Sequence, residues 1–177
     1  MLTSLLVSPL TEDEIRRSFV NCSKGEARRI SLPRGFADLP WSDLDFLGWR
    51  DPGAPERGYI VAEHAGRLLG VVLRVPPRVA RATTKTLVCS VCLTAHAGSG
   101  VSLLTARRVG EAGRRGDSVG AYICDDLACS LYLRGRKKTE ASKHQRESLT
   151  LEERIARATT NLGGFLDRVL HDTAASA

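Results

Sequence analysis

Apolar side chains recur at helical spacing near both ends of the chain. Close to the C-terminus, one helical face would carry Leu151, Ile155, Ala158, Leu162, Phe165 and Val169. Thr150 followed by Glu153 is a capping box, so this helix is predicted to begin there. Gly163-Gly164 inside it would either bend the helix or admit a close neighbour.

The N-terminal part of the chain shows the same capping pattern twice. Thr11 with Glu14 and Ser23 with Glu26 are capping boxes. Ile15, Phe19 and Cys22 would share one face of the first helix, which makes Cys22 a small core residue in this interpretation. The stretch 40–55 holds both tryptophans, and we expect an irregular or short-strand segment that packs into the N-terminal core.

Runs rich in β-branched residues predict strands in the middle of the chain. The runs 58–64 and 67–75 flank Ala65-Gly66, which predicts a tight hairpin. Further strands are expected at 101–109 and 118–123, joined by a glycine–arginine loop at 110–116. Asp125 or Asp126 would cap a following short helix that runs to about residue 134.

Five cysteines provide the candidate chemistry. Cys89-x2-Cys92 and Cys124-x4-Cys129 form two pairs separated by 31 residues. Four thiolates that converge tetrahedrally are the donor set that structural zinc prefers. A knuckle, a β-hairpin and a helix in this order predict a treble-clef finger holding one structural zinc ion. The alternatives are disulfides in an oxidising compartment or unrelated buried thiols. His96 would either replace one thiolate or be an ordinary loop histidine.

These elements predict an α+β protein. We expect an N-terminal helix plus β-hairpin layer over residues 1–80 and a treble-clef zinc finger over 81–135. A linker would follow at 136–148, and a closing C-terminal helix at 149–172.

Composition and charge narrow the function. The chain has 177 residues, of which 42% are hydrophobic, so global disorder is excluded. It has 21 Arg and 5 Lys, a bias that a GC-rich genome also produces. The net charge is +6, and residues 81–146 alone carry 12 basic and 5 acidic side chains, which favours an acidic protein face or nucleic acid as the partner.

The sequence also excludes several classes of protein. It contains no apolar run of membrane-spanning length, and its start lacks the basic region of a secretion signal, so we expect a cytoplasmic protein without membrane contact. We find no nucleophile–base constellation and predict a non-catalytic protein. We expect a monomer.

The cysteines and their surroundings resemble a known family. Cys89-Ser-Val-Cys92, Gly100-Val-Ser-Leu-Leu104, Gly120-Ala-Tyr-Ile-Cys124, Cys129 and Phe165-Leu-Asp-Arg-Val169 are similar to the FusB-type elongation factor G-binding proteins (FBP domain). The stretches 19–27 and 45–52 resemble the short actinobacterial members. The resemblance implies a non-catalytic protein that grips elongation factor G through the zinc finger and promotes its release from the ribosome. Some members thereby protect against fusidic acid.

The resemblance also implies contact residues. Tyr122 and Phe165 match family contact aromatics, and either could instead pack in the core. Val88 and Val119 replace an aromatic and a basic contact residue of the resistance proteins. Arg114 and Arg115 would attract the partner, although arginines on a hairpin, including Arg107 and Arg108, are also typical of a solvated surface. The alternative function is a ribosomal RNA-binding zinc module that uses this arginine hairpin. A redox-sensing zinc protein is the third hypothesis, and the sequence favours it least.

Overall fold

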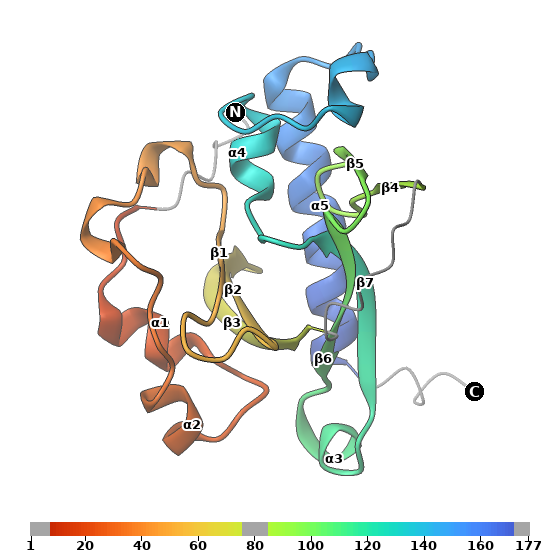
Figure 1. The fold of residues 1–177 in the computed structure, drawn as a ribbon. Coiled ribbons are helices and arrows are strands. Elements are labelled where there is room, and N and C mark those ends of the chain that lie inside the picture. The colour runs from red at the N-terminus through yellow and green to blue at the C-terminus, as the bar shows by residue number, and fades with distance from the viewer. Residues whose placement is uncertain (1–7, 76–84, 172–177) are drawn as a thin grey trace.

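A five-stranded antiparallel sheet organises the molecule. The computed structural model describes residues 8–75 and 85–171; the expected boundary between residues 80 and 81 lies outside them. The strands follow the order β1-β2-β3-β6-β7 (Figure 1). They are β1 (Leu47–Arg50), β2 (Arg57–His64), β3 (Arg67–Arg74), β6 (Val101–Arg107) and β7 (Ser118–Cys124). A separate two-stranded ribbon contains β4 (Thr86–Val88) and β5 (Ala95–Ala97).

Helices complete the mixed fold and confirm the predicted α+β class. The α-helices are α1 (Glu12–Ser18), α2 (Lys24–Arg28), α3 (Gly110–Arg114), α4 (Cys129–Leu133) and α5 (Leu151–Leu170). Three 3-10 helices are η1 (Phe36–Asp38), η2 (Trp41–Asp43) and η3 (Ala141–His144). Within the described residues, no helix is both long enough and apolar enough to cross a membrane.

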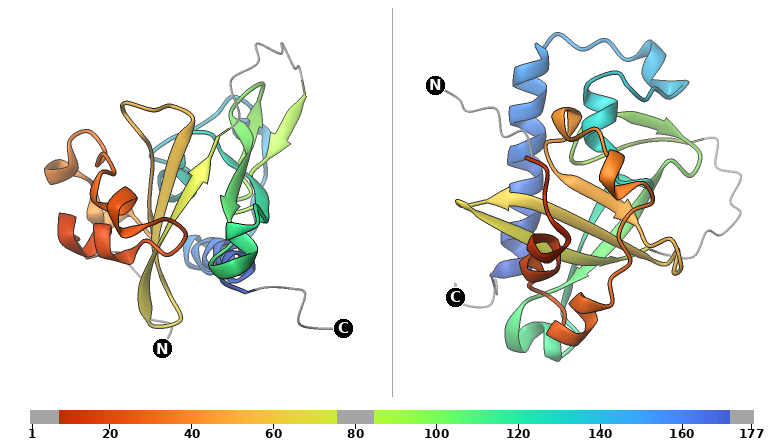
Figure 2. Two further views of the ribbon diagram at one scale, coloured as in Figure 1. Left: turned by 90° about the horizontal axis from the view of Figure 1, so that it is seen from below. Right: turned by 90° about the vertical axis from the view of Figure 1, so that its left-hand side faces the viewer.

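The sheet is covered on both faces. On β2, Tyr59 and Val61 belong to the core that contains Ile15 of α1, whereas Ile60 and Ala62 belong to the core that contains α5. Figure 2 shows α1 and α2 on one side of β1–β3 and α5 on the other. This double burial explains why the middle of β2 is apolar at consecutive positions rather than at alternate ones.

The three predicted capping boxes are confirmed. The hydroxyls of Thr11, Ser23 and Thr150 each accept a hydrogen bond from the backbone N–H of the glutamate three residues on. The carboxylate of that glutamate in turn accepts one from the backbone N–H of the capping residue. The first helix is shorter than predicted, however, because Phe19 leaves it to pair with Gly70 of β3. Cys22 therefore lies outside α1 and is half-buried, so its predicted core position is wrong.

The predicted hairpin and C-terminal helix are also present. Ala65 and Gly66 both have positive φ, +50° and +76°, as expected for the tight turn between β2 and β3. α5 runs unbroken through its two glycines. Gly163 lies beside the His64 ring, which would be 3.5 Å from an added Cβ, whereas Gly164 is open to solvent. Leu151, at the start of the helix, is exposed rather than part of the apolar stripe.

The edge of β3 is divided between two neighbours. Val20 N–H donates to Gly70 O (3.0 Å), and the Asn21 side chain bonds both the N–H and the C=O of Val72 (2.8 and 3.0 Å). Only the last part of β3 pairs with β6, at Arg74 and Thr105. The Asn21 amide also donates to Arg107 O of β6 (3.1 Å), so it joins the two strands where they do not pair directly.

Two predicted irregular segments contain short helices. The predicted loop 110–116 includes α3, because Gly113 has no Cβ and its turn can close against Arg108 O, 1.7 Å from where a Cβ would stand. The segment 136–148 includes η3, and Gln145 ties it to the zinc knuckle by bonds to Leu93 O (2.8 Å) and Ala95 N (3.2 Å). The division into separately folding units stays a prediction.

Candidate metal centre and contact surface

Two loops bring four buried cysteines together. Cys89 and Cys92 follow β4, Cys124 ends β7, and Cys129 begins α4. Their ligand atoms all lie within 4.8 Å of one another, with Sγ–Sγ distances of 3.7 Å for Cys89–Cys129 and 3.5 Å for Cys92–Cys124. Tetrahedral Zn–S bonds of about 2.3 Å require sulfurs about 3.8 Å apart. The cluster therefore fits the predicted single structural zinc ion.

The electrostatics of the cluster also favour a cation. Hydrogen bonds from Cys124 and Cys129 lower the pKa of Cys89, whereas hydrogen bonds with Cys124 and Cys89 raise the pKa of Cys129. Four thiols this close and this buried cannot all ionise on their own, because each thiolate opposes the next. A divalent ion removes that conflict, and four thiolate ligands leave it no open position for catalysis.

His96 supports the cluster from outside the four ligands. It lies on β5, is buried, and places Nε2 3.3 Å from Cys124 Sγ. Its ring packs edge-on against Tyr132, and burial lowers its pKa. A neutral imidazole can donate to the thiolate and hold it in place. The cluster consists of the four cysteines, so His96 does not replace a thiolate, and it lies on β5 rather than in a loop. The glycine at position 100 was the one hint in the sequence that His96 packs closely there, because an added Cβ at Gly100 would stand 2.5 Å from His96 Nδ1.

The second ligand loop docks onto the N-terminal strands. Leu127 adopts φ +58° and is almost fully buried. Its carbonyl oxygen would lie 2.6 Å from a Cβ at Gly48, and its Cδ1 3.0 Å from one at Gly58. Two glycines on β1 and β2 therefore form the hollow that receives Leu127. Sequence reasoning missed this role, because neither glycine lies in a turn.

Ion pairs fix the same loop and the helix after it. The carboxylate of Asp125 accepts from Arg50 (3.0 Å) and from Ser102 (2.7 Å). Asp126 accepts from Ala128 N–H, 3.0 Å away, but α4 begins at Cys129 without a side-chain cap, so the predicted capping role of these two aspartates is wrong. Arg134 at the end of α4 binds both carboxylate oxygens of Asp45.

The predicted contact aromatics lie in opposite environments. Tyr122 on β7 is 51% exposed and stands opposite Leu103 of β6, which is 43% exposed. Its carbonyl oxygen accepts from the N–H (2.7 Å) and hydroxyl (2.6 Å) of Ser90, inside the zinc knuckle. Phe165 is 2% exposed and belongs to the core between α5 and the sheet. Phe165 therefore packs in the core, which was the alternative to a contact role, and its side chain is not accessible to a partner in this conformation.

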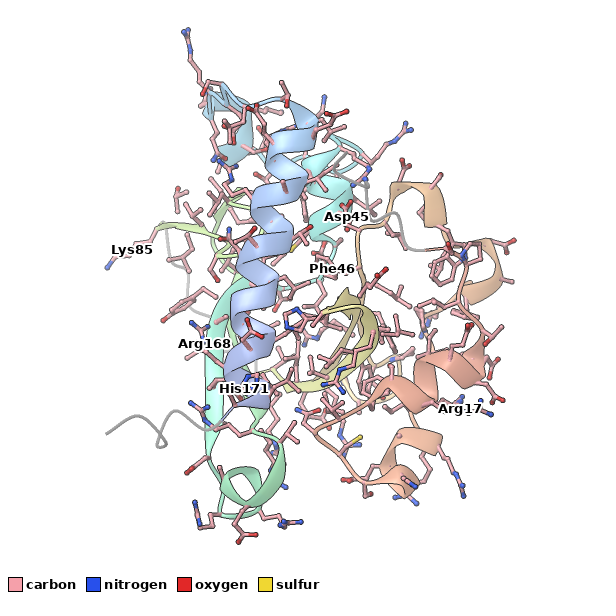
Figure 3. The ribbon with its side chains drawn as sticks, turned by 180° about the vertical axis from the view of Figure 1, so that it is seen from behind. Arg17, Asp45, Phe46, Lys85, Arg168 and His171 are labelled. Carbon is pink, nitrogen blue, oxygen red and sulfur yellow. The ribbon has the colours of Figure 1, made fainter. Side chains whose placement is uncertain are left out.

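The hairpin arginines divide into two groups. Arg114 pairs with Glu111 (3.1 Å) and, like Arg115, is exposed at the tip between β6 and β7. Arg108 instead donates to the carbonyls of Arg168 and His171, which lie together at the end of α5 (Figure 3). Arg108 is half-buried on the surface and caps the C-terminus of the helix as well.

A family match agrees with the geometry of the metal centre. Residues 14–169 match the family described as "FBP C-terminal treble-clef zinc-finger". Among solved structures, the fusidic acid resistance protein FusC matches with a TM-score of 0.45 and 16% identity, over 84% of this chain. This chain spans 57% of the FusC chain. The curated proteins contain no significant match.

Proposed function

Because the chain belongs to the FBP C-terminal treble-clef zinc-finger family, we propose that it binds elongation factor G and promotes release of that factor from the ribosome. It would act by binding alone and catalyse no reaction. A protein of this kind can shift its partner only through different affinities for the partner's conformations. It would therefore bind best to the conformation of the factor that leaves the ribosome, and in doing so lower susceptibility to fusidic acid.

The exposed side chain of Tyr122 carries this proposal. Tyr122, Leu103 and Val88 are apolar or aromatic, and each is between 43% and 51% exposed. Tyr122 and Leu103 stand opposite each other on β7 and β6, and tyrosine is enriched at the centres of protein interfaces. We call these three residues the contact patch.

The zinc knuckle gives the contact patch a fixed shape. Two hydrogen bonds from Ser90 hold the backbone of Tyr122, and Ser90 lies between the ligands Cys89 and Cys92. Val88 directly precedes the first ligand. Because the metal fixes these positions, binding would not need to order a flexible strand, which is a main cost of association.

The exposed arginines at the tip of the hairpin would act at longer range. Arg114 ends α3 and Arg115 follows it, shortly before β7 begins. They therefore lie near the first residue of β7, whereas Cys124 is its last. Exposed charges at the edge of an interface mainly accelerate encounter, and salt screens them. Replacing both with alanine should slow association and leave dissociation almost unchanged.

The test compares Tyr122→Ala with Leu151→Ala. Both residues are exposed and apolar or aromatic, but Leu151 lies at the start of α5, outside the contact patch. The zinc-loaded proteins would be titrated against elongation factor G by surface plasmon resonance. We expect Tyr122→Ala to weaken binding by about 1–3 kcal/mol, mainly through faster dissociation, and Leu151→Ala to bind like the parent.

Two results would contradict the proposal. One is a folded, zinc-loaded parent protein that does not bind the factor. The other is a Tyr122→Ala protein that binds as tightly as the parent, which would remove the contact patch. A second assay follows the factor on ribosomes stalled with fusidic acid, where the parent should shorten its residence and Tyr122→Ala should do so less.

A further inference from the structure

A basic groove lies beside the zinc centre, on residues that the contact patch does not share. It has a volume of about 400 Å³. It runs between the zinc knuckle, α4, the segment around η3 and the start of α5. These elements lie in the upper part of the ribbon in Figure 1. Four cationic side chains line it: Lys137, Lys138, Lys143 and Arg154.

The lysines of this groove are unusual for this chain. The protein has only five lysines beside 21 arginines, and three of the five line this one groove. A compositional bias toward arginine does not explain such a gathering. Lysine binds phosphate as a compact, mobile point charge, whereas the arginine fork gives fixed bidentate geometry with carboxylate and phosphate alike.

Part of this positive charge has no neutralising partner among the residues that the structure describes. Lys138 makes no hydrogen bond or ion pair with any residue in 8–75 or 85–171, and Arg154 Nε is buried there without a hydrogen-bond partner. Among the described residues, Glu147 is the one carboxylate in the lining; Arg157 binds it at 2.6 Å, and Arg154 also interacts with it electrostatically. Lys137 and Lys143 pair with Asp126 and Glu140, whose carboxylates do not belong to the lining.

Apolar and aromatic groups accompany the charges. Tyr132 and Leu93 line the same groove, and Lys137 Nζ lies 5.6 Å from the centre of the Tyr132 ring. A positively charged groove combined with an aromatic side chain is the usual arrangement for single-stranded nucleic acids, in which cations follow the phosphates and bases contact the ring. A convex acidic protein face would leave the floor of such a groove unfilled.

We propose that this groove binds the phosphodiester backbone of single-stranded nucleic acid, at a site separate from the contact patch. Lys138 would supply a charge that has no partner among the described residues, Arg154 would offer its unbonded Nε–H, and Lys137 and Lys143 would exchange their carboxylate partners for phosphates. This site does not depend on binding to elongation factor G, so the two activities can fail separately.

The test measures binding of fluorescein-labelled oligouridylate and oligothymidylate, each of about 10 nucleotides, by fluorescence anisotropy over a range of salt concentrations. Four phosphate contacts predict a slope of log K against log salt of about −2.8. The double variant Lys138→Ala with Lys143→Ala should bring the slope to about −1.4. The matched control replaces Lys24 on α2 and Lys85 with alanine. Lys85 lies before β4, outside the groove, and points away from α5 in Figure 3.

Binding of either oligonucleotide, with the smaller slope confined to the groove variant, supports the site; the two probes show whether RNA or DNA is preferred. Several outcomes overturn it. These are no binding by the zinc-loaded parent, equal loss in the lysine control, or loss only in the Arg114→Ala, Arg115→Ala protein. Displacement by inorganic phosphate or polyglutamate at an equal concentration of charge would also overturn it, since the groove would then be a general anion site.

Discussion

Replacing Gly48 tests how the metal loop is seated on the sheet. In Gly48→Ala, the new Cβ would stand 2.6 Å from Leu127 O and 2.9 Å from Leu127 Cβ. The first contact is with backbone, which a change of rotamer cannot relieve, so either β1 or the 124–129 loop must move. Overpacking of this kind costs about 3 kcal/mol at the upper end of its usual range. Alanine recovers about 0.5–1 kcal/mol of backbone entropy in a strand. The net expectation is a loss of about 2 kcal/mol in the free energy of unfolding.

The matched control is Gly164→Ala, for which the sign should be opposite. Gly164 lies on the exposed side of α5, and no atom comes within 4 Å of an added Cβ. Alanine should therefore stabilise the helix by about 0.5–1 kcal/mol. Equilibrium unfolding in urea, followed by tryptophan fluorescence in the presence of zinc, measures both changes.

A second measurement separates local strain from a general loss of stability. If the 124–129 loop is displaced in Gly48→Ala, zinc should pass to a chromogenic chelator faster than from the parent, whereas Gly164→Ala should release it at the parental rate. A Gly48→Ala protein with unchanged stability and unchanged zinc release would refute the proposed docking of Leu127.

Three further predictions concern other parts of the fold. Cys124→Ala should lose the zinc ion and Cys22→Ala should keep it, which elemental analysis can measure. Burial raises the pKa of Cys22 to about 11, so this thiol should react slowly with iodoacetamide at neutral pH. Arg134→Met should lower the free energy of unfolding by about 3–5 kcal/mol, because it leaves the buried Asp45 carboxylate unpaired; a change below 1 kcal/mol in a urea titration would contradict this. Asn21→Ala should lower the free energy of unfolding by about 1–3 kcal/mol and speed amide hydrogen exchange at Val72, because the Val72 N–H loses its acceptor. Unchanged exchange at Val72 would contradict this.

Local signals predicted local structure well. Each capping box needs only two side chains three residues apart, and the turn at Ala65-Gly66 needs only two adjacent positions. The cysteine spacing was equally informative, because zinc geometry limits how four thiolates can converge. These features were predictable because everything that determines them lies within a short window or in a fixed donor set.

Features that depend on distant partners were not predictable. Nothing near Asn21 in the sequence indicates that its amide will bond Val72 and Arg107, because those groups arrive 51 and 86 residues later. Tyr122 and Phe165 look alike as aromatics in apolar surroundings, and only the packing of α5 against the sheet makes one exposed and the other buried. In the sequence, Gly48 is only a residue that disfavours a strand. The structure shows why a glycine is needed there, because Leu127 O occupies the space of a Cβ.

The division of the β3 edge has a consequence for synthesis on the ribosome. When β3 has just left the exit tunnel, β6 has not yet emerged from it, since 26 residues separate Arg74 from Val101. An unpaired strand edge on a nascent chain invites association with other chains. Residues 19–21 are already present at that moment, and their bonds to Gly70 and Val72 occupy most of the edge. The growing chain thus carries its own neighbour for β3, and this neighbour stays in place when β6 completes the sheet.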